Sequence, residues 1–244
     1  MILLVDAGNS RIKWGVYEAG QWRDKRAVPS SDLPALLEHW RGLDPAWVFI
    51  SNVAGDGVLA LVEQAFPIGT RRFWLKPKAE AYGLRNRYSV PDSLGADRYA
   101  ALLAARRQGL GHVVVASLGT ALTVDALTAE GEFLGGMILP GYRTMLRGLE
   151  QSTQGVRVGF GQWSAFPTNT SDAVETGIVS ALIGAVEAQR DRLQAHVGAA
   201  ATVLLTGGDA VLIKPRLREP VVLVEDLVLE GLLWVAKESG AVGV

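Results

Sequence analysis

Residues 1–13, MILLVDAGNSRIK, begin with a short apolar run and end in a polar bend. The run from Met1 to Val5 has the length of a buried strand and is too short for a helix that stands alone. Asp6-Ala7-Gly8-Asn9-Ser10 follows it directly, and a second strand-like run begins at Ile12. We therefore expect a tight β-hairpin whose bend carries a carboxylate, a glycine and two short polar side chains.

This bend has the chemistry that holds nucleotide phosphates and Mg²⁺. Gly8 lets an anion approach the main chain, while Asn9 and Ser10 can donate hydrogen bonds. Asp6 can hold a metal ion or its waters. An ordinary hairpin uses the same residue types for local geometry alone, so the residues by themselves leave both interpretations open.

The composition is that of a well-buried globular protein. The chain has 244 residues, of which 49% are hydrophobic and 20% charged, and its formal net charge is −1. That charge gives no global field that would favour nucleic acid or an anionic membrane. The absence of cysteine excludes disulfides and thiolate metal sites and fits a reducing compartment. We expect a cytoplasmic protein, because the N-terminus lacks the features of a signal peptide and no apolar run approaches the ~20 residues of a membrane helix.

The opening pattern returns in the second half of the chain. The apolar run His112–Ala116 precedes Ser117-Leu118-Gly119-Thr120-Ala121, and a strand-like run follows. One offset of 111 residues relates five pairs, namely Asp6 and Ser117, Gly8 and Gly119, Ser10 and Ala121, Gly20 and Gly131, and Trp22 and Phe133. We interpret this as duplication of a β-hairpin lobe, with lobes at 1–110 and 111–244 and a boundary near Gly109–Gly111. Two facing lobes would bring both glycine turns to one nucleotide cleft.

The remaining pattern predicts an α/β protein. Helices are expected at 33–40, 58–66, from Asp92 or Ser93 through Ala104, at 142–150, from Ser171 or Asp172 to about His196, and at 227–238. Further strands are expected at 21–27, 46–53, 71–75, 122–127, from 132, 202–205 and 220–224. Small residues of the long helix, Gly177, Ala181, Gly184 and Ala185, suit either packing within the chain or contact with a second copy.

Four glycine-bearing turns, at Gly8, Gly119, Gly135-Gly136 and Gly207-Gly208, are candidates to present backbone N–H groups to phosphate or adenosine. There is no P-loop motif. The three histidines are far apart in sequence and have no partner at metal-ligand spacing, so we expect no histidine metal site or nucleophile.

Asp97 is the strongest candidate for an acid–base group. A helix that begins at Asp92 or Ser93 places Asp97 in its first turn, where the helix dipole favours negative charge. It could act as a base that orients a substrate hydroxyl, or it could be a helix-stabilising acid paired with Arg98 or Arg87. Arg98, with Arg85 and Arg87 nearby in sequence, is placed to hold an anionic substrate.

Together these motifs resemble the type III pantothenate kinase family, which includes proteins called Bvg accessory factor. Asp6-Ala7-Gly8-Asn9-Ser10 is similar to the D-x-G-N-[ST] signature, and Gly95-Ala96-Asp97-Arg98 to the G-x-D-R signature with Tyr88 upstream. Gly119-Thr120-Ala121-Leu122-Thr123 is similar to G-T-A-x-T, and Asn169-Thr170 with Gly177 to a later element. The likeness spans almost the whole chain.

The resemblance implies two ribonuclease-H-like lobes of the acetate kinase, Hsp70 and actin superfamily, with mixed sheets flanked by helices. It implies a homodimer that shares its substrate pocket and phosphorylates pantothenate with ATP and Mg²⁺. The residues Asp6, Ala7, Gly8, Asn9, Ser10, Arg11, Ile12 and Lys13 would bind ATP and its metal, and Thr120 would contact the phosphates. Asp97 would be the proton acceptor, and Tyr88, Gly95, Ala96, Asp97, Arg98 and Thr170 would contact pantothenate.

One position departs from the family pattern. Many members carry an Asp that coordinates a monovalent cation where this chain has Ser117. A neutral hydroxyl is a poorer cation ligand than a carboxylate, which puts a need for K⁺ or NH₄⁺ in question. Two rivals to the kinase interpretation are a sugar kinase or phosphatase of the same superfamily and a non-catalytic regulator that keeps the nucleotide cleft.

Overall fold

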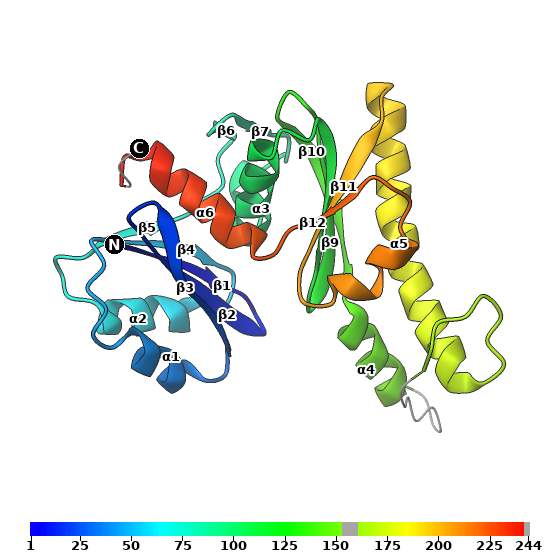
Figure 1. Ribbon diagram of the computed structural model, residues 1–244, viewed down its shortest axis with the longest axis horizontal. Coiled ribbons are helices and arrows are strands. Elements are labelled where there is room, and N and C mark those ends of the chain that lie inside the picture. The colour runs from blue at the N-terminus through cyan, green and yellow to red at the C-terminus, as the bar shows by residue number, and fades with distance from the viewer. Residues whose placement is uncertain (153–160, 242–244) are drawn as a thin grey trace. The chain divides into compact units, whose positions relative to one another are not determined.

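A computed structural model describes residues 1–152 and 161–241 (Figure 1). The chain divides into two compact units. Unit 1 contains Met1–Gln108 together with the chain from Asp226 onward, and unit 2 contains Gly109–Glu225. The sequence places the second lobe at 111–244, so the units differ from the expected lobes chiefly in the C-terminal helix, which packs in unit 1.

Unit 1 is built on a five-stranded sheet with the order β3-β2-β1-β4-β5. β1 pairs antiparallel with β2 and parallel with β4, β2 pairs antiparallel with β3, and β4 pairs parallel with β5. The strands are β1 (Ile2–Ala7), β2 (Arg11–Glu18), β3 (Gln21–Pro29), β4 (Trp47–Asn52) and β5 (Arg71–Trp74). The helices are α1 (Leu33–Trp40), α2 (Asp56–Ala65), α3 (Ala96–Arg107) and α6 (Leu227–Glu238). Helices α1 and α2 lie on one face of the sheet, and α3 and α6 on the other (Figure 1).

The alternation of side chains along β1 decides what faces each helix layer. Leu3, Val5 and Ala7 belong to the core that includes Leu36 and Trp40 of α1. Because successive strand residues point to opposite faces, Ile2, Leu4 and Asp6 face the α3/α6 layer. Asp6 is therefore the polar end of an otherwise apolar strand face, and it is directed toward α3 and α6.

Helices α3 and α6 pack in direct contact because α6 has a glycine at the crossing. A Cβ built on Gly231 would lie 2.0 Å from the carbonyl oxygen of Ala100 in α3, a distance that no real side chain could keep. Any larger residue would push the helices apart. Gly231 thus allows the first turns of these helices to come to the same face of the sheet.

Unit 2 repeats the architecture of unit 1 with the order β12-β11-β8-β9-β10. β8 pairs antiparallel with β9 and parallel with β11, β9 pairs antiparallel with β10, and β11 pairs parallel with β12. The strands are β8 (His112–Leu118), β9 (Ala121–Leu127), β10 (Glu132–Pro140), β11 (Ala201–Thr206) and β12 (Val221–Leu223). Helix α5 (Thr170–Val197) packs on this sheet through Ile178, Val179, Leu182 and Val186, and α4 (Tyr142–Ser152) precedes it.

The strand pairing refines the duplication seen in the sequence. In unit 1, Asp6 is opposite Lys13 across the first hairpin, whereas Ser117 is opposite Thr123 in unit 2. The second hairpin is therefore one residue shorter, so Ser10 and Ala121 are not equivalent. Tyr17 opposite Trp22 matches Leu127 opposite Phe133, and each pair lies beside a register shift of one residue. The offset of 111 thus holds before the first bend and again in the third strand.

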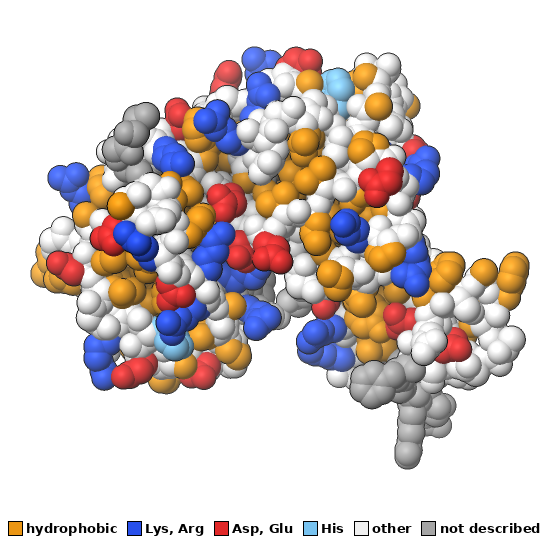
Figure 2. Space-filling view, in the orientation of Figure 1, with side chains coloured by type: hydrophobic (Ala, Val, Ile, Leu, Met, Phe, Trp, Pro, Cys, Tyr) orange, Lys and Arg blue, Asp and Glu red, His pale blue; other side chains and the backbone are white. Residues whose placement is uncertain are grey.

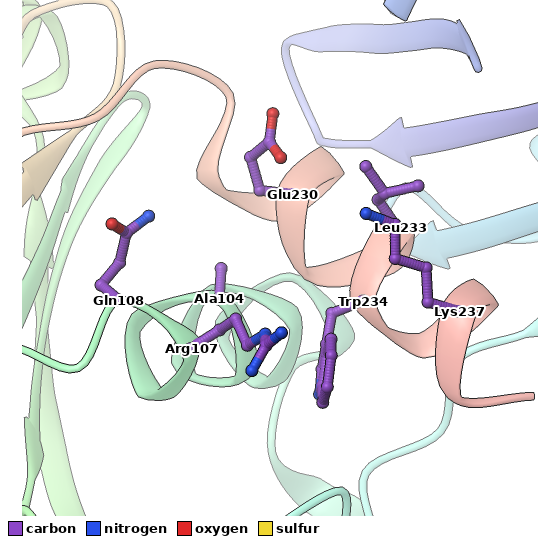
Figure 3. A pocket seen from close by; sticks show the side chains of 7 residues that line it. All are labelled: Ala104, Arg107, Gln108, Glu230, Leu233, Trp234 and Lys237. Atoms are coloured by element: carbon purple, nitrogen blue, oxygen red, sulfur yellow. The ribbon is translucent and has the colours of Figure 1, made fainter. Parts of the chain in front are cut away.

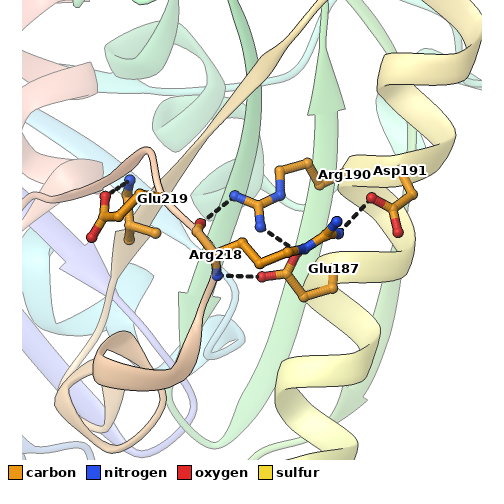
Figure 4. A network of polar contacts seen from close by, with 6 residues as sticks. Glu187, Arg190, Asp191, Arg218 and Glu219 are labelled. Carbon is orange, nitrogen blue, oxygen red and sulfur yellow. Dashed lines mark hydrogen bonds and ion pairs between the residues drawn. The ribbon is translucent and has the colours of Figure 1, made fainter.

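A group of ion pairs fastens the loop before β12 to α5 (Figure 4). Arg190 is almost fully buried, and it donates to the carbonyl of Arg218 and to the carboxylate of Glu187. Arg218 also binds Glu187, with Nε and Oε2 2.8 Å apart, and Asp191. A buried guanidinium is tolerated in a core when hydrogen-bonded partners compensate for its desolvation, and Arg190 has both a carboxylate and a carbonyl partner.

Several expected boundaries were wrong. α3 begins after Gly95, and residues Pro91–Ser93 form a separate 3₁₀ turn, so neither Asp92 nor Ser93 caps it. Asn169 caps α5, because its side chain accepts the Asp172 N–H at 2.9 Å. The short hairpin of β6 (Glu80–Ala81) and β7 (Leu84–Asn86) was not predicted. Gly135 and Gly136 lie inside β10, and so form no turn.

Two surface properties bear on partners. On the face shown in Figure 2, acidic and basic side chains are interspersed within each unit. None of the helices in residues 1–152 and 161–241 combines the length and apolar character needed to cross a membrane.

Candidate active site

The first candidate residue, Asp6, lies at the end of β1 directly opposite Lys13 of β2. The bend between them is closed by a hydrogen bond from the Gly8 N–H to the Arg11 carbonyl at 3.1 Å, and its tip, Asn9 to Arg11, is exposed. A Cβ on Gly8 would lie 3.0 Å from the same carbonyl oxygen. A side chain at this position would crowd that carbonyl group, so the tight bend itself favours glycine, in addition to any part in binding an anion.

The environment of Asp6 raises its pKa from 3.8 to about 7. Burial is the largest cause, followed by the negative charge of Asp97, while the ammonium of Lys13 acts in the opposite direction. Asp226 adds a further negative charge that raises the pKa. Asp6 and Asp97 therefore lie close enough for their charges to interact, which the kinase interpretation requires.

Asp97 lies in the first turn of α3, as the sequence predicts. Its Oδ1 atom accepts a hydrogen bond from the Arg98 N–H at 2.8 Å, so the carboxylate folds back over the start of the helix. A Cβ on Gly95 would lie 2.6 Å from that Oδ1 atom. Gly95 thus leaves the space that the carboxylate of Asp97 occupies.

Arg98 and Tyr88 form a bonded pair beside Asp97. The Arg98 Nη1 atom donates to the Tyr88 hydroxyl at 2.8 Å, and Arg98 is 6% exposed. Asn86 shapes the loop before Tyr88, because it accepts the Tyr88 N–H at 3.0 Å and donates to the Pro91 carbonyl at 3.1 Å. The expected pantothenate residues Tyr88 and Gly95–Arg98 are thereby brought together in unit 1.

Unit 2 holds the remaining expected residues, Thr120, Ser117 and Thr170. The Thr120 carbonyl accepts hydrogen bonds from the Gly141 N–H at 2.9 Å and from the Thr144 hydroxyl at 2.7 Å. A Cβ on Gly141 would lie 2.0 Å from the Gly119 carbonyl oxygen, so the two turns are in direct contact. Thr170 is the exposed first residue of α5.

Gly207 brings a third turn against the same hairpin. A Cβ there would lie 2.2 Å from the Leu118 carbonyl oxygen, and its φ of +102° is unfavourable for other residues. The turns at Gly119 and Gly207 are thus neighbours, as a shared phosphate or nucleoside site within unit 2 would need.

Ser117 is the penultimate residue of β8, opposite Thr123 and Thr206. Asp125, an acid on the same hairpin, is almost fully buried on β9, opposite Val115. Across the described ranges 1–152 and 161–241, no three His, Cys, Asp or Glu side chains are grouped to ligate an ion.

Sequence reasoning missed Asp226. Its Oδ1 atom accepts a hydrogen bond from the Lys13 Nζ atom at 3.0 Å. An acid immediately before an apolar helix signals a helix cap, and nothing in the sequence shows that this one faces β2 instead. The contact joins residues 213 positions apart.

A separate hollow of about 130 Å³ lies between α3 and α6 (Figure 3). It is lined by Ala104, Arg107, Gln108, Glu230, Leu233, Trp234 and Lys237, with the Arg107 guanidinium 4.2 Å from the ring centre of Trp234. None of the expected site residues lines it.

Two units of ribonuclease-H-like topology, each with a polar bend after its first strand, define a protein of the actin-like fold class. Solved structures support the fold. A Campylobacter jejuni protein of the Baf family has a TM-score of 0.64 at 23% identity, and the match covers 98% of this chain and 100% of that one. Component A of the (R)-2-hydroxyglutaryl-CoA dehydratase of Acidaminococcus fermentans has a TM-score of 0.57 at 14% identity, with 99% of each chain covered.

The sequence comparisons are more specific. The pattern of the type III pantothenate kinase family matches residues 2–192. The type III pantothenate kinase of Chromobacterium violaceum is 44% identical over 238 residues, which cover 97% of this chain and 99% of that protein. That of Thiobacillus denitrificans is 42% identical over 243 residues, covering 98% and 97%. The chain belongs to the type III pantothenate kinase family.

Proposed function

We propose that this protein transfers the terminal phosphoryl group of ATP to the primary hydroxyl of pantothenate, the first step of coenzyme A synthesis, in the cytoplasm. Family membership supports the reaction and the substrates. The observation that carries the mechanism is the shared environment of Asp6 and Asp97 in unit 1. In phosphoryl transfer, one carboxylate commonly holds Mg²⁺ at the nucleotide and another orients the acceptor alcohol.

The bend after β1 binds the nucleotide in this proposal. Its residues are Asp6, Ala7, Gly8, Asn9, Ser10, Arg11, Ile12 and Lys13, and Thr120 of unit 2 contacts the phosphates. The Asp6 carboxylate suits Mg²⁺, which is usually held by one or two carboxylates together with substrate phosphates. When bound, Mg²⁺ would neutralise charge on the phosphate oxygens.

Asp97 accepts the proton of the pantothenate hydroxyl in this proposal. Its carboxylate is fixed by the Arg98 N–H, which leaves the other oxygen atom for the substrate. Tyr88, Gly95, Ala96, Arg98 and Thr170 contact pantothenate, whose carboxylate is the natural partner for the Arg98 guanidinium. Ser117 offers only a hydroxyl as a cation ligand, so we propose a weak or absent response to K⁺ or NH₄⁺.

A coupled assay of ADP release tests the reaction. We expect turnover that depends on pantothenate and is not restored by sugars. ADP release without pantothenate, or with a sugar in its place, would indicate another kinase or a phosphatase of the superfamily. Nucleotide binding with no turnover would indicate a non-catalytic regulator.

Gly95→Ala tests the placement of Asp97. The new methyl group would collide with the Asp97 carboxylate, so we expect kcat to fall about tenfold while Mg·ATP binding is unchanged, because proton-transfer groups depend on precise placement. Steady-state kinetics with thermal melting measures both effects. Gly57→Ala in α2 is the matched control, since a Cβ there meets only Leu33 at 4.0 Å. Equal kcat values for the two variants would contradict the proposed position.

We propose a homodimer through the outer face of α5. Gly177, Ala181 and Gly184 lie on its exposed side, away from the buried Leu182 and Val186. Ala181→Glu should convert the dimer to a monomer in light scattering, because a charge would be buried in the contact. Leu59→Glu is the control, because the Leu59 side chain is exposed on α2 and lies outside the proposed interface. A monomeric wild type, or a dimer that tolerates Ala181→Glu, would exclude this interface.

A further inference from the structure

Asp226 stands directly before α6 yet does not cap it. Its carbonyl accepts the first helical hydrogen bond, from the Glu230 N–H at 3.2 Å, but its side chain makes no capping bond. Asp at this position normally uses its carboxylate to bind the helix N–H groups. Here the backbone adopts the left-handed conformation, with φ 51° and ψ 38°, and the carboxylate binds Lys13 instead.

The Lys13–Asp226 pair lies at the nucleotide bend. Lys13 is directly opposite Asp6 across β1 and β2, and its Nζ atom is 3.0 Å from Asp226 Oδ1. The two side chains are 30% and 24% exposed, so the pair is partly shielded from solvent. Holding a long lysine side chain in one place costs conformational entropy. Because the ion pair with Asp226 already orders Lys13, that entropy is not lost again when a ligand binds.

We propose that Asp226 is a positioning residue that holds the Lys13 ammonium beside Asp6, ready to contact a nucleotide phosphate. This rests on the proposed function, since it assigns Lys13 to the nucleotide. Asp226 is separated from the bend by more than 200 residues, and α6 carries it there. The C-terminal helix therefore contributes to the nucleotide site through the residue that directly precedes it.

A second ion pair in the same unit provides a matched control. Glu230, one turn along α6, binds Lys25 of β3 with Oε1 and Nζ 3.0 Å apart, and these side chains are 33% and 30% exposed. Both pairs therefore join α6 to the β2/β3 ribbon at equal distance and similar exposure. Only Lys13 lies opposite Asp6.

The experiment compares Asp226→Asn with Glu230→Gln. We expect Asp226→Asn to raise KM for Mg·ATP about tenfold with kcat changed less than about threefold, since ground-state and transition-state contacts to the nucleotide are lost together. Glu230→Gln should leave both constants near the wild-type values. Thermal melting confirms that both variants are folded. Equal effects of the two variants, or a lower KM in Asp226→Asn, would overturn the proposal, the latter because Asp226 would then be withholding Lys13 from ATP.

Binding of Mg·ADP by calorimetry separates this proposal from the proposed function. Asp226→Asn should weaken binding about tenfold even if pantothenate proves not to be the acceptor. In a Lys13→Met background, Asp226→Asn should have no further effect, because the positioned group is absent. Additive losses in the double variant would show that Asp226 acts independently of Lys13.

Discussion

Replacing Asp97 by Asn should lower kcat at least ~10²-fold and leave Mg·ATP binding within about twofold. The amide keeps the size of the carboxylate but cannot accept the proton of an alcohol, and removal of a positioned base commonly costs about this much. Single-turnover kinetics with pantothenate, combined with calorimetric binding of a nucleotide, measures both quantities.

The control for this variant is Asp92→Asn. Asp92 lies a few residues upstream in the 3₁₀ turn, outside α3. We expect it to retain nearly full activity. If Asp97→Asn were as active as Asp92→Asn, Asp97 would be a helix-stabilising acid and the mechanism would need another base.

Replacing Asp6 by Asn should abolish useful turnover and yet stabilise the protein at pH 8. The pKa of Asp6 is raised to about 7, chiefly by burial and then by Asp97. From about pH 4 to pH 7 the folded state keeps a proton that the unfolded chain has released, so the free energy of unfolding falls as pH rises through this window. Asn carries no charge and removes that loss.

The raised pKa of Asp6 determines both the size and the pH dependence of the expected stability gain. A shift of about three pKa units corresponds to about 4 kcal/mol, and we expect about half of it because Asp6 keeps some contact with solvent. Asp6→Asn should therefore gain about 2 kcal/mol at pH 8 and nothing below about pH 4. Chemical denaturation at both pH values measures this. A variant no more stable than the wild type at pH 8 would show that Asp6 is not held at a raised pKa.

The predicted gain in stability of Asp6→Asn would also show that the acid at position 6 is kept for function and not for folding. A carboxylate that is costly in the free protein becomes favourable once Mg²⁺ and the nucleotide are bound. Stability is commonly lost at functional sites in this way. Addition of Mg·ADP should therefore raise the melting temperature of the wild type more than that of Asp6→Asn.

The sequence predicts those features that depend on short-range patterns. Two short apolar runs on either side of a polar bend, within residues 1–17, predict the first hairpin, and the return of the pattern at 112–127 predicts the second. The sequence also predicts Asp97 in the first turn of a helix, although the helix begins at Ala96 and not at the expected Asp92 or Ser93. Likeness to known family motifs supplied the substrate, which periodicity could not provide.

Long-range packing is what the sequence conceals. Helix α6 joins unit 1 although it follows unit 2 in the chain, because Gly231 allows it to contact Ala100 of α3. The Lys13–Asp226 contact depends on that arrangement. The 3₁₀ turn before α3 was missed because Asp92 and Ser93 are good capping residues, whereas Gly95 is preferred here for the space it leaves to Asp97.

Product identification tests the central claim most directly. The wild-type protein with ATP, Mg²⁺ and pantothenate should yield one phosphate ester on the primary hydroxyl for each ADP released, as mass spectrometry and ³¹P NMR would show. ADP formed without that ester, or bound nucleotide with neither product, would contradict the assignment.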